Sequence, residues 1–322
     1  MKLRFLLLGS FVVAAAVLGV GVGPVFVSPG DVLASLTGGE GDRIVETVRL
    51  PRVAAGLVVG ASLAVAGALF QALLRNALAE PYLLGVGPGA LLGVTVAAVA
   101  TGVSALPPAG LRGGAAFLGA LAVGALIFSV ARRSVRSPTA SVLLAGIAVG
   151  AFVHAVATLL LHAAVSDWHV VVRWMLGDLG LATWGDIAFV AGVFVVGGAL
   201  AGSRARALDV MTLGDEAAWF GGVAVPRALA WLGGTACLLA ASTVAVAGLV
   251  GFVGLVVPHL ARGVVGTSHR RVLPASALLG AGLLVLADAL ARTAVAPEVL
   301  PLGVVTALLG APFLAWLVLA RT

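Results

Sequence analysis

A few ionisable residues inside apolar stretches of this sequence could do chemistry. Asp288 lies in an apolar run, four residues before Arg292. A carboxylate at membrane depth could carry a proton, as in ion-coupled secondary transporters. Residues four apart on a helix are neighbours, however, so a local ion pair is the simpler interpretation. His154 and His162, eight residues apart, would lie near one face of a helix. They could bind a metal or a haem, but two ordinary polar positions explain them more simply.

Lysine and cysteine are nearly absent, which excludes several kinds of site. Lys2 is the only lysine, so the chain has no phosphate-binding loop ending in Gly-Lys-Ser/Thr. Cys237 is the only cysteine, so an internal disulfide and a cysteine-cluster metal site are excluded. Neither a His-Glu-x-x-His nor a Gly-x-Ser-x-Gly motif occurs. We therefore expect no catalytic residues, no metal site and no cofactor in this chain.

The composition places these residues in a lipid bilayer. Hydrophobic residues make up 61% of the 322 residues and charged residues only 10%, against roughly a quarter charged in soluble domains. A soluble globule cannot hide so much apolar surface, and disordered chains have the opposite composition. The net charge of +6 comes from scattered arginines without a basic block, so we expect no nucleic-acid partner. The sequence predicts an all-α membrane protein.

The apolar runs predict about ten transmembrane helices, because a bilayer core needs about 20 apolar residues per helix. The first has a basic start and a run too long for a signal peptide, so we expect an uncleaved helix. No polar stretch is long enough for a soluble domain, so residues 1–322 would form one transmembrane domain. The expected helices are 5–27, 52–74, 83–104, 112–131, 140–163, 187–202, 228–248, 250–264, 273–291 and 301–319.

The basic residues predict the orientation. With the N-terminus inside, 13 of the 19 lysine and arginine residues fall on the inner side. This excess follows the positive-inside rule, so we expect both termini in the cytoplasm. The inner set is Lys2, Arg4, Arg75, Arg132, Arg133, Arg136, Arg204, Arg206, Arg227, Arg262, Arg270, Arg271 and Arg321. The outer set is Arg43, Arg49, Arg52, Arg112, Arg173 and Arg292.

The run 240–265 contains glycines and Pro258, so it could be one helix or two. Interrupted helices occur in membranes only where the freed backbone groups are buried in protein or line a cavity. This pattern is typical of a transport pathway.

Five stretches, in order along nearly the whole chain, resemble one known family. They are Arg49-Leu-Pro-Arg52, the segment 71–86 beginning Gln-Ala-Leu-Leu-Arg-Asn, Leu213–Gly222, the Gly-rich segment 247–262, and Pro301–Pro312. These stretches resemble the FecCD family of ABC-transporter permeases, the membrane subunits of cobalamin, ferric-siderophore and haem importers. The resemblance implies a type II ABC importer permease fold, which makes residues 1–322 a single transmembrane permease domain.

The resemblance also implies a docking site on the outer face. Arg49, Arg52 and Arg292 match the positions at which this family docks a substrate-binding protein through Glu–Arg pairs. The fixed fork of a guanidinium suits a carboxylate partner. The alternative is that the three arginines only anchor the helices at lipid headgroups.

The longest inner loop matches the segment that docks into the ATPase in this family. We expect a short helix between Gly214 and Gly222, with its acids in the first turn where they favour the helix dipole. The alternative is a solvated surface helix. Trp219 and Gly221 depart from the family pattern, so the partner surface would differ in detail. The coupling set is Leu213, Gly214, Asp215, Glu216, Ala218 and Gly222.

Three further positions match the inner gate of the family. They are Asn76, Leu78 and Thr139, and Ala77 stands where the family usually has proline. The alternative is that these are ordinary turn residues.

The sequence thus predicts the permease subunit of a binding-protein-dependent ABC importer for a metal chelate, in the cytoplasmic or inner membrane. Ferric siderophore or haem is the favoured cargo, and cobalamin is next. The expected partners are a second permease copy, two ATP-binding cassette subunits that bind ATP and magnesium, and a periplasmic or lipid-anchored binding protein. Two other classes stay open. One is a secondary transporter that relies on Asp288, and the other is a membrane-embedded enzyme.

Overall fold

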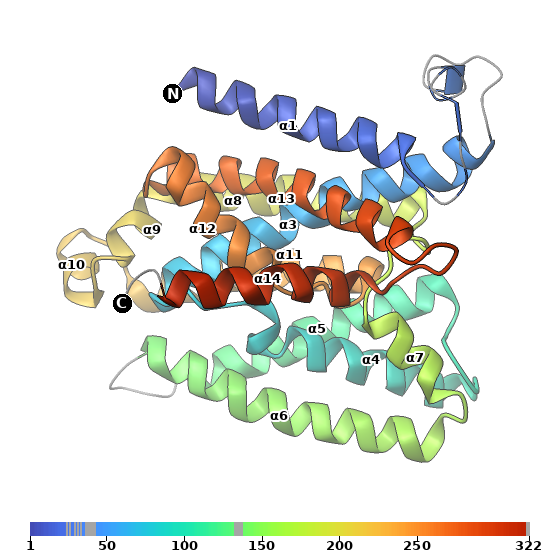
Figure 1. The fold of residues 1–322 in the computed structure, drawn as a ribbon. Coiled ribbons are helices and arrows are strands. Elements are labelled where there is room, and N and C mark those ends of the chain that lie inside the picture. Colours follow the sequence, from blue (N-terminus) through green and yellow to red (C-terminus); the bar gives the residue numbers. More distant parts are fainter. Residues whose placement is uncertain are drawn as a thin grey trace.

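The computed structural model describes residues 1–23, 25, 27–28, 30, 32, 34–35, 43–131 and 138–319. Ten long helices in this part of the chain overlap the ten ranges expected from the sequence, one each (Figure 1). They are α1 (Lys2–Gly21), α3 (Leu50–Leu74), α4 (Val86–Thr101), α5 (Ala109–Ala131), α6 (Pro138–Ala164), α8 (Trp184–Ser203), α11 (Val225–Ala247), α12 (Val253–Val265), α13 (His269–Thr293) and α14 (Leu302–Leu319).

Seven of these helices are long and apolar enough to cross a membrane. The other three, α4, α12 and α14, are shorter apolar helices. The fold is therefore the all-α membrane fold that the composition predicts. The exact number of membrane crossings stays a prediction.

Several short elements join the long helices. The sequence predicts α10 (Asp215–Phe220) as the short helix between Gly214 and Gly222. It does not predict α7 (Trp168–Met175), α9 (Ala205–Met211) or the π-helix η1 (Val45–Arg49). A further short element, the 3-10 helix η2 (Pro81–Leu84), precedes α4. A search for membrane-length apolar runs overlooks such elements because they are much shorter than a bilayer is thick.

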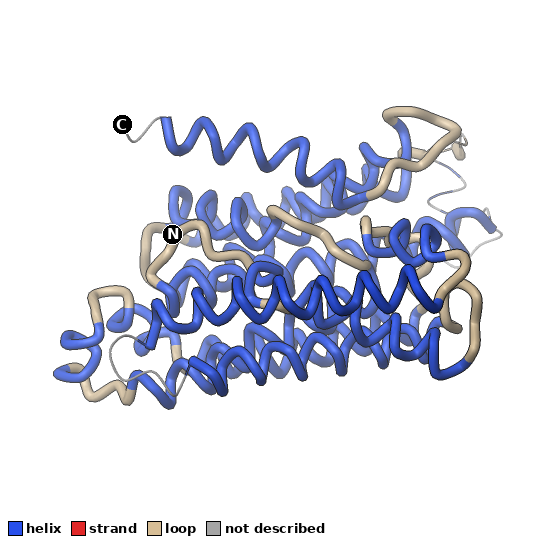
Figure 2. Tube along the Cα trace, turned by 90° about the horizontal axis from the view of Figure 1, so that it is seen from below, coloured by secondary structure: helices blue, strands red, loops and turns tan. Residues whose placement is uncertain are grey.

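The long helices run side by side, so the bundle has two ends (Figures 1 and 2). The N-terminus and the end of α14 lie at one end together with α9 and α10, which we call the α10 end. The opposite end carries α7 and the connection from α13 to α14, and we call it the α7 end (Figure 1). Four arginines used to predict the orientation lie outside the described residues: Arg132, Arg133, Arg136 and Arg321.

Helix α3 forms the centre of the bundle, because glycines let its neighbours approach closely. A Cβ atom added to Gly60 would overlap the carbonyl oxygen of Gly280 in α13. One added to Gly67 would overlap the carbonyl oxygen of Gly254 in α12. In lipid, this close backbone packing replaces the hydrophobic drive between helices. Most of α3 from Val59 onward is buried.

The run 240–265 forms two helices, α11 and α12, separated by an extended break. Two side chains near η2 support this break. The Glu80 carboxylate accepts a hydrogen bond of 2.6 Å from the N–H of Phe252, which has a left-handed φ of 65°. The Tyr82 hydroxyl accepts one of 3.1 Å from the N–H of Val250. Side chains from a distant segment thus satisfy backbone groups that neither helix can pair.

Pro258 lies inside α12 and has no N–H. The carbonyl of Gly254, four residues earlier, therefore lacks its usual hydrogen-bond donor within the helix. Gln71 of α3 supplies the missing donor. Its Nε2 donates to the Gly254 carbonyl at 3.3 Å and to the Leu255 carbonyl at 3.0 Å. The Gln71 Oε1 in turn accepts 2.6 Å from Arg262. One buried glutamine thus joins the central helix to the proline-containing helix.

Candidate functional site

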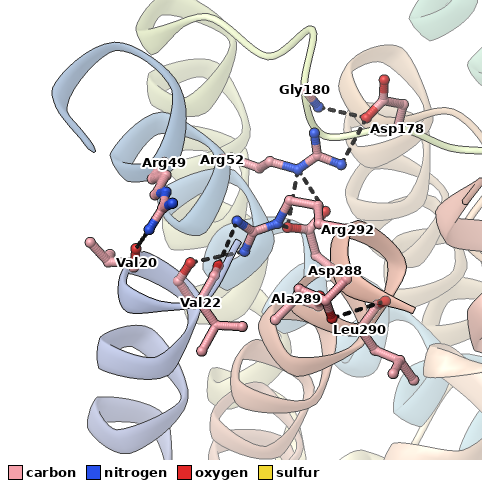
Figure 3. Close-up of polar contacts among 12 residues, drawn as sticks. Val20, Val22, Arg49, Arg52, Asp178, Gly180, Asp288, Ala289, Leu290 and Arg292 are labelled. Carbon is pink, nitrogen blue, oxygen red and sulfur yellow. Dashed lines mark hydrogen bonds and ion pairs between the residues drawn. The ribbon is translucent and has the colours of Figure 1, made fainter. Parts of the chain in front are cut away.

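The three arginines predicted to dock a binding protein gather at the α7 end of the bundle (Figure 3). They come from η1, α3 and α13, and each is at most 8% exposed. The structure therefore brings Arg49, Arg52 and Arg292 together as the resemblance implies, but it buries them. Their hydrogen-bond partners lie within the chain.

Two of these arginines complete the C-terminal end of α1. The last carbonyls of a helix lack intrahelical donors. Arg49 Nη1 donates to the Val20 and Gly21 carbonyls at 2.8 and 2.9 Å, and its Nη2 donates to the Val25 carbonyl. Arg292 donates to the Gly19 carbonyl at 2.9 Å and to the Val22 carbonyl at 3.0 Å. A positive charge here also favours the negative end of the helix dipole.

Asp288 joins Arg52 and Arg292 in a buried cluster (Figure 3). Arg52 Nε donates to its two carboxylate oxygens at 2.8 and 3.1 Å, and Arg292 Nε donates at 2.9 Å. Asp178 adds a partly exposed carboxylate, 3.1 Å from Arg52 Nη2. The local Asp288–Arg292 pair is thus present. Arg52, 236 residues away along the chain, extends it into a link between α3 and α13.

An exposed guanidinium lies nearby at the same end. Arg173 of α7 lines an open cavity of about 550 Å³ together with Asp178 and Glu298. Arg173 and Glu298 are exposed. This cavity exposes charges of both signs at the surface, whereas the buried cluster holds its charges inside the protein.

The predicted coupling segment forms a projecting helix at the α10 end (Figure 1). Gly214 has a φ of 118° and Gly222 a φ of 73°, conformations that favour glycine, and they bracket α10 as expected. Ala218 is buried, whereas Leu213 is 76% exposed and Phe220 is 87% exposed. Trp219, which departs from the family pattern, is exposed beside Phe220. Exposed aromatic and aliphatic side chains on a projecting helix are typical of an interaction surface.

Two polar contacts hold α9 and α10 against the rest of the bundle. Arg75, the C-cap of α3, forms a 3.0 Å ion pair with Asp215 in the first turn of α10. Glu216 beside it is exposed. The second contact starts from Asp209 of α9, whose carboxylate accepts 2.7 Å from the N–H of His269 at the start of α13.

Asp209 also contacts the His269 ring nitrogen Nδ1 at 2.6 Å and the Ser268 hydroxyl at 3.2 Å. Partial burial raises the pKa of this carboxylate, but the hydrogen bonds from His269 and Ser268 outweigh that effect and hold it below its usual value. The α9–α10 unit is therefore attached to α3 through Asp215 and to α13 through Asp209.

A comparison with known families matches the FecCD transport family over residues 11–320. This match covers nearly the whole chain. The chain belongs to the FecCD transport family.

Individual relatives in this family are transport permeases. The cobalamin import system permease BtuC of Halobacterium salinarum is 40% identical over 86% of this chain and 74% of its own length. The hemin transport permease HmuU of Yersinia pestis is 41% identical over 85% and 82% of the two chains. The vitamin B12 import permease BtuC of Escherichia coli is 38% identical over 99% and 95%.

A solved structure supports the fold. It is described as an inward-facing conformation of a metal-chelate type ABC transporter. It superimposes with a TM-score of 0.86 at 28% identity, over 99% of both chains. Members of the FecCD family named above are permeases rather than ATPases, in agreement with the single lysine of this chain.

The positions expected for the inner gate of a FecCD permease lie at two places. Asn76 and Leu78 form a turn after α3, in which Asn76 Oδ1 accepts 2.9 Å from the Leu78 N–H. Such a turn is typical of asparagine and does not need the proline that Ala77 replaces. Leu78 is exposed. Thr139 lies in the first turn of α6, and its side chain is outside the described residues.

The two histidines of α6 are exposed. His162 contacts the Trp168 ring, with ring centroids 4.9 Å apart. The described residues contain no group of three or more His, Cys, Asp or Glu side chains that could hold a metal ion.

Sequence reasoning missed three contacts that organise the FecCD fold here: Arg52–Asp178, Gln71–Gly254 and Asp209–His269. Only the second had a signal in the sequence. Pro258 leaves the carbonyl four residues earlier without a donor, and buried carbonyls seldom stay unpaired. A nearby buried amide was therefore required, although the sequence does not say which one.

Proposed function

We propose that this chain is the membrane-spanning permease subunit of a binding-protein-dependent ABC importer for a metal chelate. Ferric siderophore or haem is the favoured cargo, and cobalamin is next. Relatives named for cobalamin and hemin import support this class of cargo. The chain would lie in the cytoplasmic or inner membrane as a multi-pass protein, with both termini and the α10 end inside.

The observation that carries the proposal is the exposed apolar surface of α10 and its two attachments to the bundle. A separate ATPase subunit would grip Leu213, Trp219 and Phe220. Movement of α10 would reach the central helix through the Asp215–Arg75 pair. It would reach α13 through α9 and Asp209. ATP and magnesium would be bound by the partner, because the chain has no lysine for a phosphate-binding loop.

We propose that the α7 end receives the binding protein. Arg49, Arg52 and Arg292 are bonded inside the chain, so in this conformation they would act by shaping this end. The exposed Arg173 offers the free guanidinium that a carboxylate partner needs. Arg173→Glu is expected to weaken binding-protein affinity, whereas the matched change Arg206→Glu at the opposite end should not. Equal affinity for the wild type and both variants would contradict docking at this end.

We propose that two copies form the pathway between them and that Asn76, Leu78 and Thr139 form its inner gate. The exposed apolar side chains of α6 and α14 would face either lipid or the second copy, and they include Leu144, Phe152, Leu308 and Trp316. No observation favours a proton-coupled transporter, because hydrogen bonds from two arginines occupy both oxygens of Asp288.

The coupling proposal is tested by binding between the purified permease and the ATPase subunit encoded with it. Trp219→Ala plus Phe220→Ala is expected to weaken this binding at least about tenfold, as removal of interface aromatics does. Trp184→Ala, an exposed tryptophan at the start of α8, is the matched control. If the double variant bound the ATPase as tightly as the control, α10 would not be the coupling surface.

A further inference from the structure

A groove at the α10 end lies beside the predicted coupling segment, whose last residue, Gly222, forms part of its lining. It lies between the end of α8, α9 and the start of α11, and its volume is about 460 Å³. Its lining combines two arginines with hydroxyl, aromatic and aliphatic side chains. They include Ser203, Arg204, Arg227, Trp231, Leu232 and Thr235.

The two arginines give the groove an unbalanced positive charge. Arg204 is the C-cap of α8, and Arg227 lies in the first turn of α11. Both side chains are exposed, and within the described residues neither has a hydrogen-bond or ion-pair partner. Among the described residues, those that line the groove include no carboxylate. Basic pockets between membrane helices are suited to anionic headgroups.

Trp231 places this charge at the membrane interface. It lies four residues after Arg227 and four before Thr235, so the three residues share one face of α11. Trp231 is 76% exposed. It lies about 9 Å along the helix axis from Val225, at 1.5 Å per residue. Tryptophan is enriched at this depth, where its ring meets the headgroup region.

The groove becomes apolar away from the helix ends. Leu200, one turn before Arg204 in α8, and Leu232, five residues after Arg227 in α11, are lining residues. Val195 and Val196, one turn further along α8, are exposed and extend this apolar surface. A ligand that fits the whole groove therefore has an anionic head and long apolar chains.

We propose that this groove binds an anionic phospholipid in the leaflet at the α10 end. Arg204 and Arg227 contact its phosphate, Trp231 lies beside its glycerol region, and the acyl chains follow α8 and α11. Free phosphate satisfies the arginines but leaves Trp231 and the apolar wall without a role. An acidic segment of a partner protein would not need the apolar wall on the flank of two long hydrophobic helices.

The test uses the full-length chain purified in detergent and titrated with phosphatidylglycerol or with phosphatidylcholine of the same acyl chains. Native mass spectrometry or thermal unfolding reports binding. Arg204→Gln plus Arg227→Gln is compared with Arg206→Gln, which removes another exposed arginine that does not line the groove. Each arginine that contacts an anionic headgroup strengthens lipid affinity about fivefold. The double variant should therefore bind phosphatidylglycerol about thirtyfold more weakly. Wild type and Arg206→Gln should prefer phosphatidylglycerol equally.

Three results would overturn the proposal. If the double variant kept the preference of the wild type, the groove would not be the lipid site. If inorganic phosphate protected the wild type as well as phosphatidylglycerol does, with the same dependence on the arginines, the site would bind phosphate alone. A third arm measures ATPase binding. Loss of that binding in the double variant, with lipid binding unchanged, would assign the groove to a protein contact instead.

Discussion

Arg75, which ends the central helix α3, forms a 3.0 Å ion pair with Asp215, the first residue of α10. The pair joins the largely buried helix α3 to α10, where Trp219 and Phe220 are exposed. Both side chains are partly exposed, so such a pair contributes only about 0–1 kcal/mol to stability. We therefore expect the Arg75–Asp215 pair to transmit movement between α10 and α3 rather than to stabilise the fold.

Asp215→Asn is therefore expected to reduce ATP-driven uptake severalfold while the melting temperature stays nearly unchanged. The measurement compares uptake and thermal unfolding for Asp215→Asn, Arg75→Gln and the double variant. Because both single changes break the same contact, the double variant should lose no more uptake than either single one. Glu46→Gln, which alters an exposed acid of η1 outside the coupling set, is the matched control. Full uptake in Asp215→Asn would remove the role of this pair.

Asp288 should be essential to the fold of the α7 end. Asp288→Ala leaves Arg52 and Arg292 buried without their carboxylate, which typically costs about 3–5 kcal/mol. Thermal unfolding in detergent should show a large loss. Asp178→Asn, which alters the exposed partner of Arg52, should cost no more than about 1 kcal/mol. Similar losses in the two variants would mean that the buried cluster does not stabilise this end.

Gly67 should not tolerate even one added methyl group. Its Cβ would overlap the backbone of Gly254, so Gly67→Ala must push α12 away from α3. We expect a lower melting temperature and a lower yield of folded protein. Gly234→Ala in α11 is the control, because nothing lies within 4 Å of the Cβ it would add. Alanine is favoured over glycine in a helix by about 1 kcal/mol, so this control should be neutral or stabilising.

The attachment of α9 to α13 should depend on pH. Hydrogen bonds from His269 and Ser268 hold the pKa of Asp209 below its ordinary value of 3.8. The carboxylate is thus stabilised more in the folded chain, and its contribution is complete above that ordinary value. This contribution is lost as the pH falls through the lowered pKa. Unfolding of the wild type and Asp209→Asn at pH 7 and below pH 4 measures it. The two curves should differ at pH 7 and converge in acid, and a constant gap would contradict the assignment.

The helices of this fold were predictable because membrane helices carry a strong local signal. Ten apolar ranges each correspond to one helix, and Gly214 and Gly222 bracket α10 as expected. A long apolar run must form its backbone hydrogen bonds within itself in lipid. The class of structure and the approximate bounds of its long elements therefore follow from local sequence.

The environment of the arginines could not be predicted in the same way. Position along the chain places Arg49, Arg52 and Arg292 at one end of the bundle, and the resemblance gives them a docking role. Their burial depends on carbonyls of α1 and on Asp288, which only the folded chain brings to them. These contacts join segments 29 to 273 residues apart, and such distant contacts leave no periodic signal in a single sequence.

The central claim is that ATP hydrolysed by a partner drives a metal chelate through a pathway built by this chain. The most direct measurement is chelate uptake into proteoliposomes that contain the permease, its ATPase and the binding protein. Ferric siderophore, haem and cobalamin are each supplied outside the proteoliposomes. The driving force is either ATP enclosed inside them or a proton gradient across their membrane. The account predicts ATP-dependent uptake of at least one of these chelates and none with the gradient alone. Uptake driven by the gradient without the ATPase would contradict it.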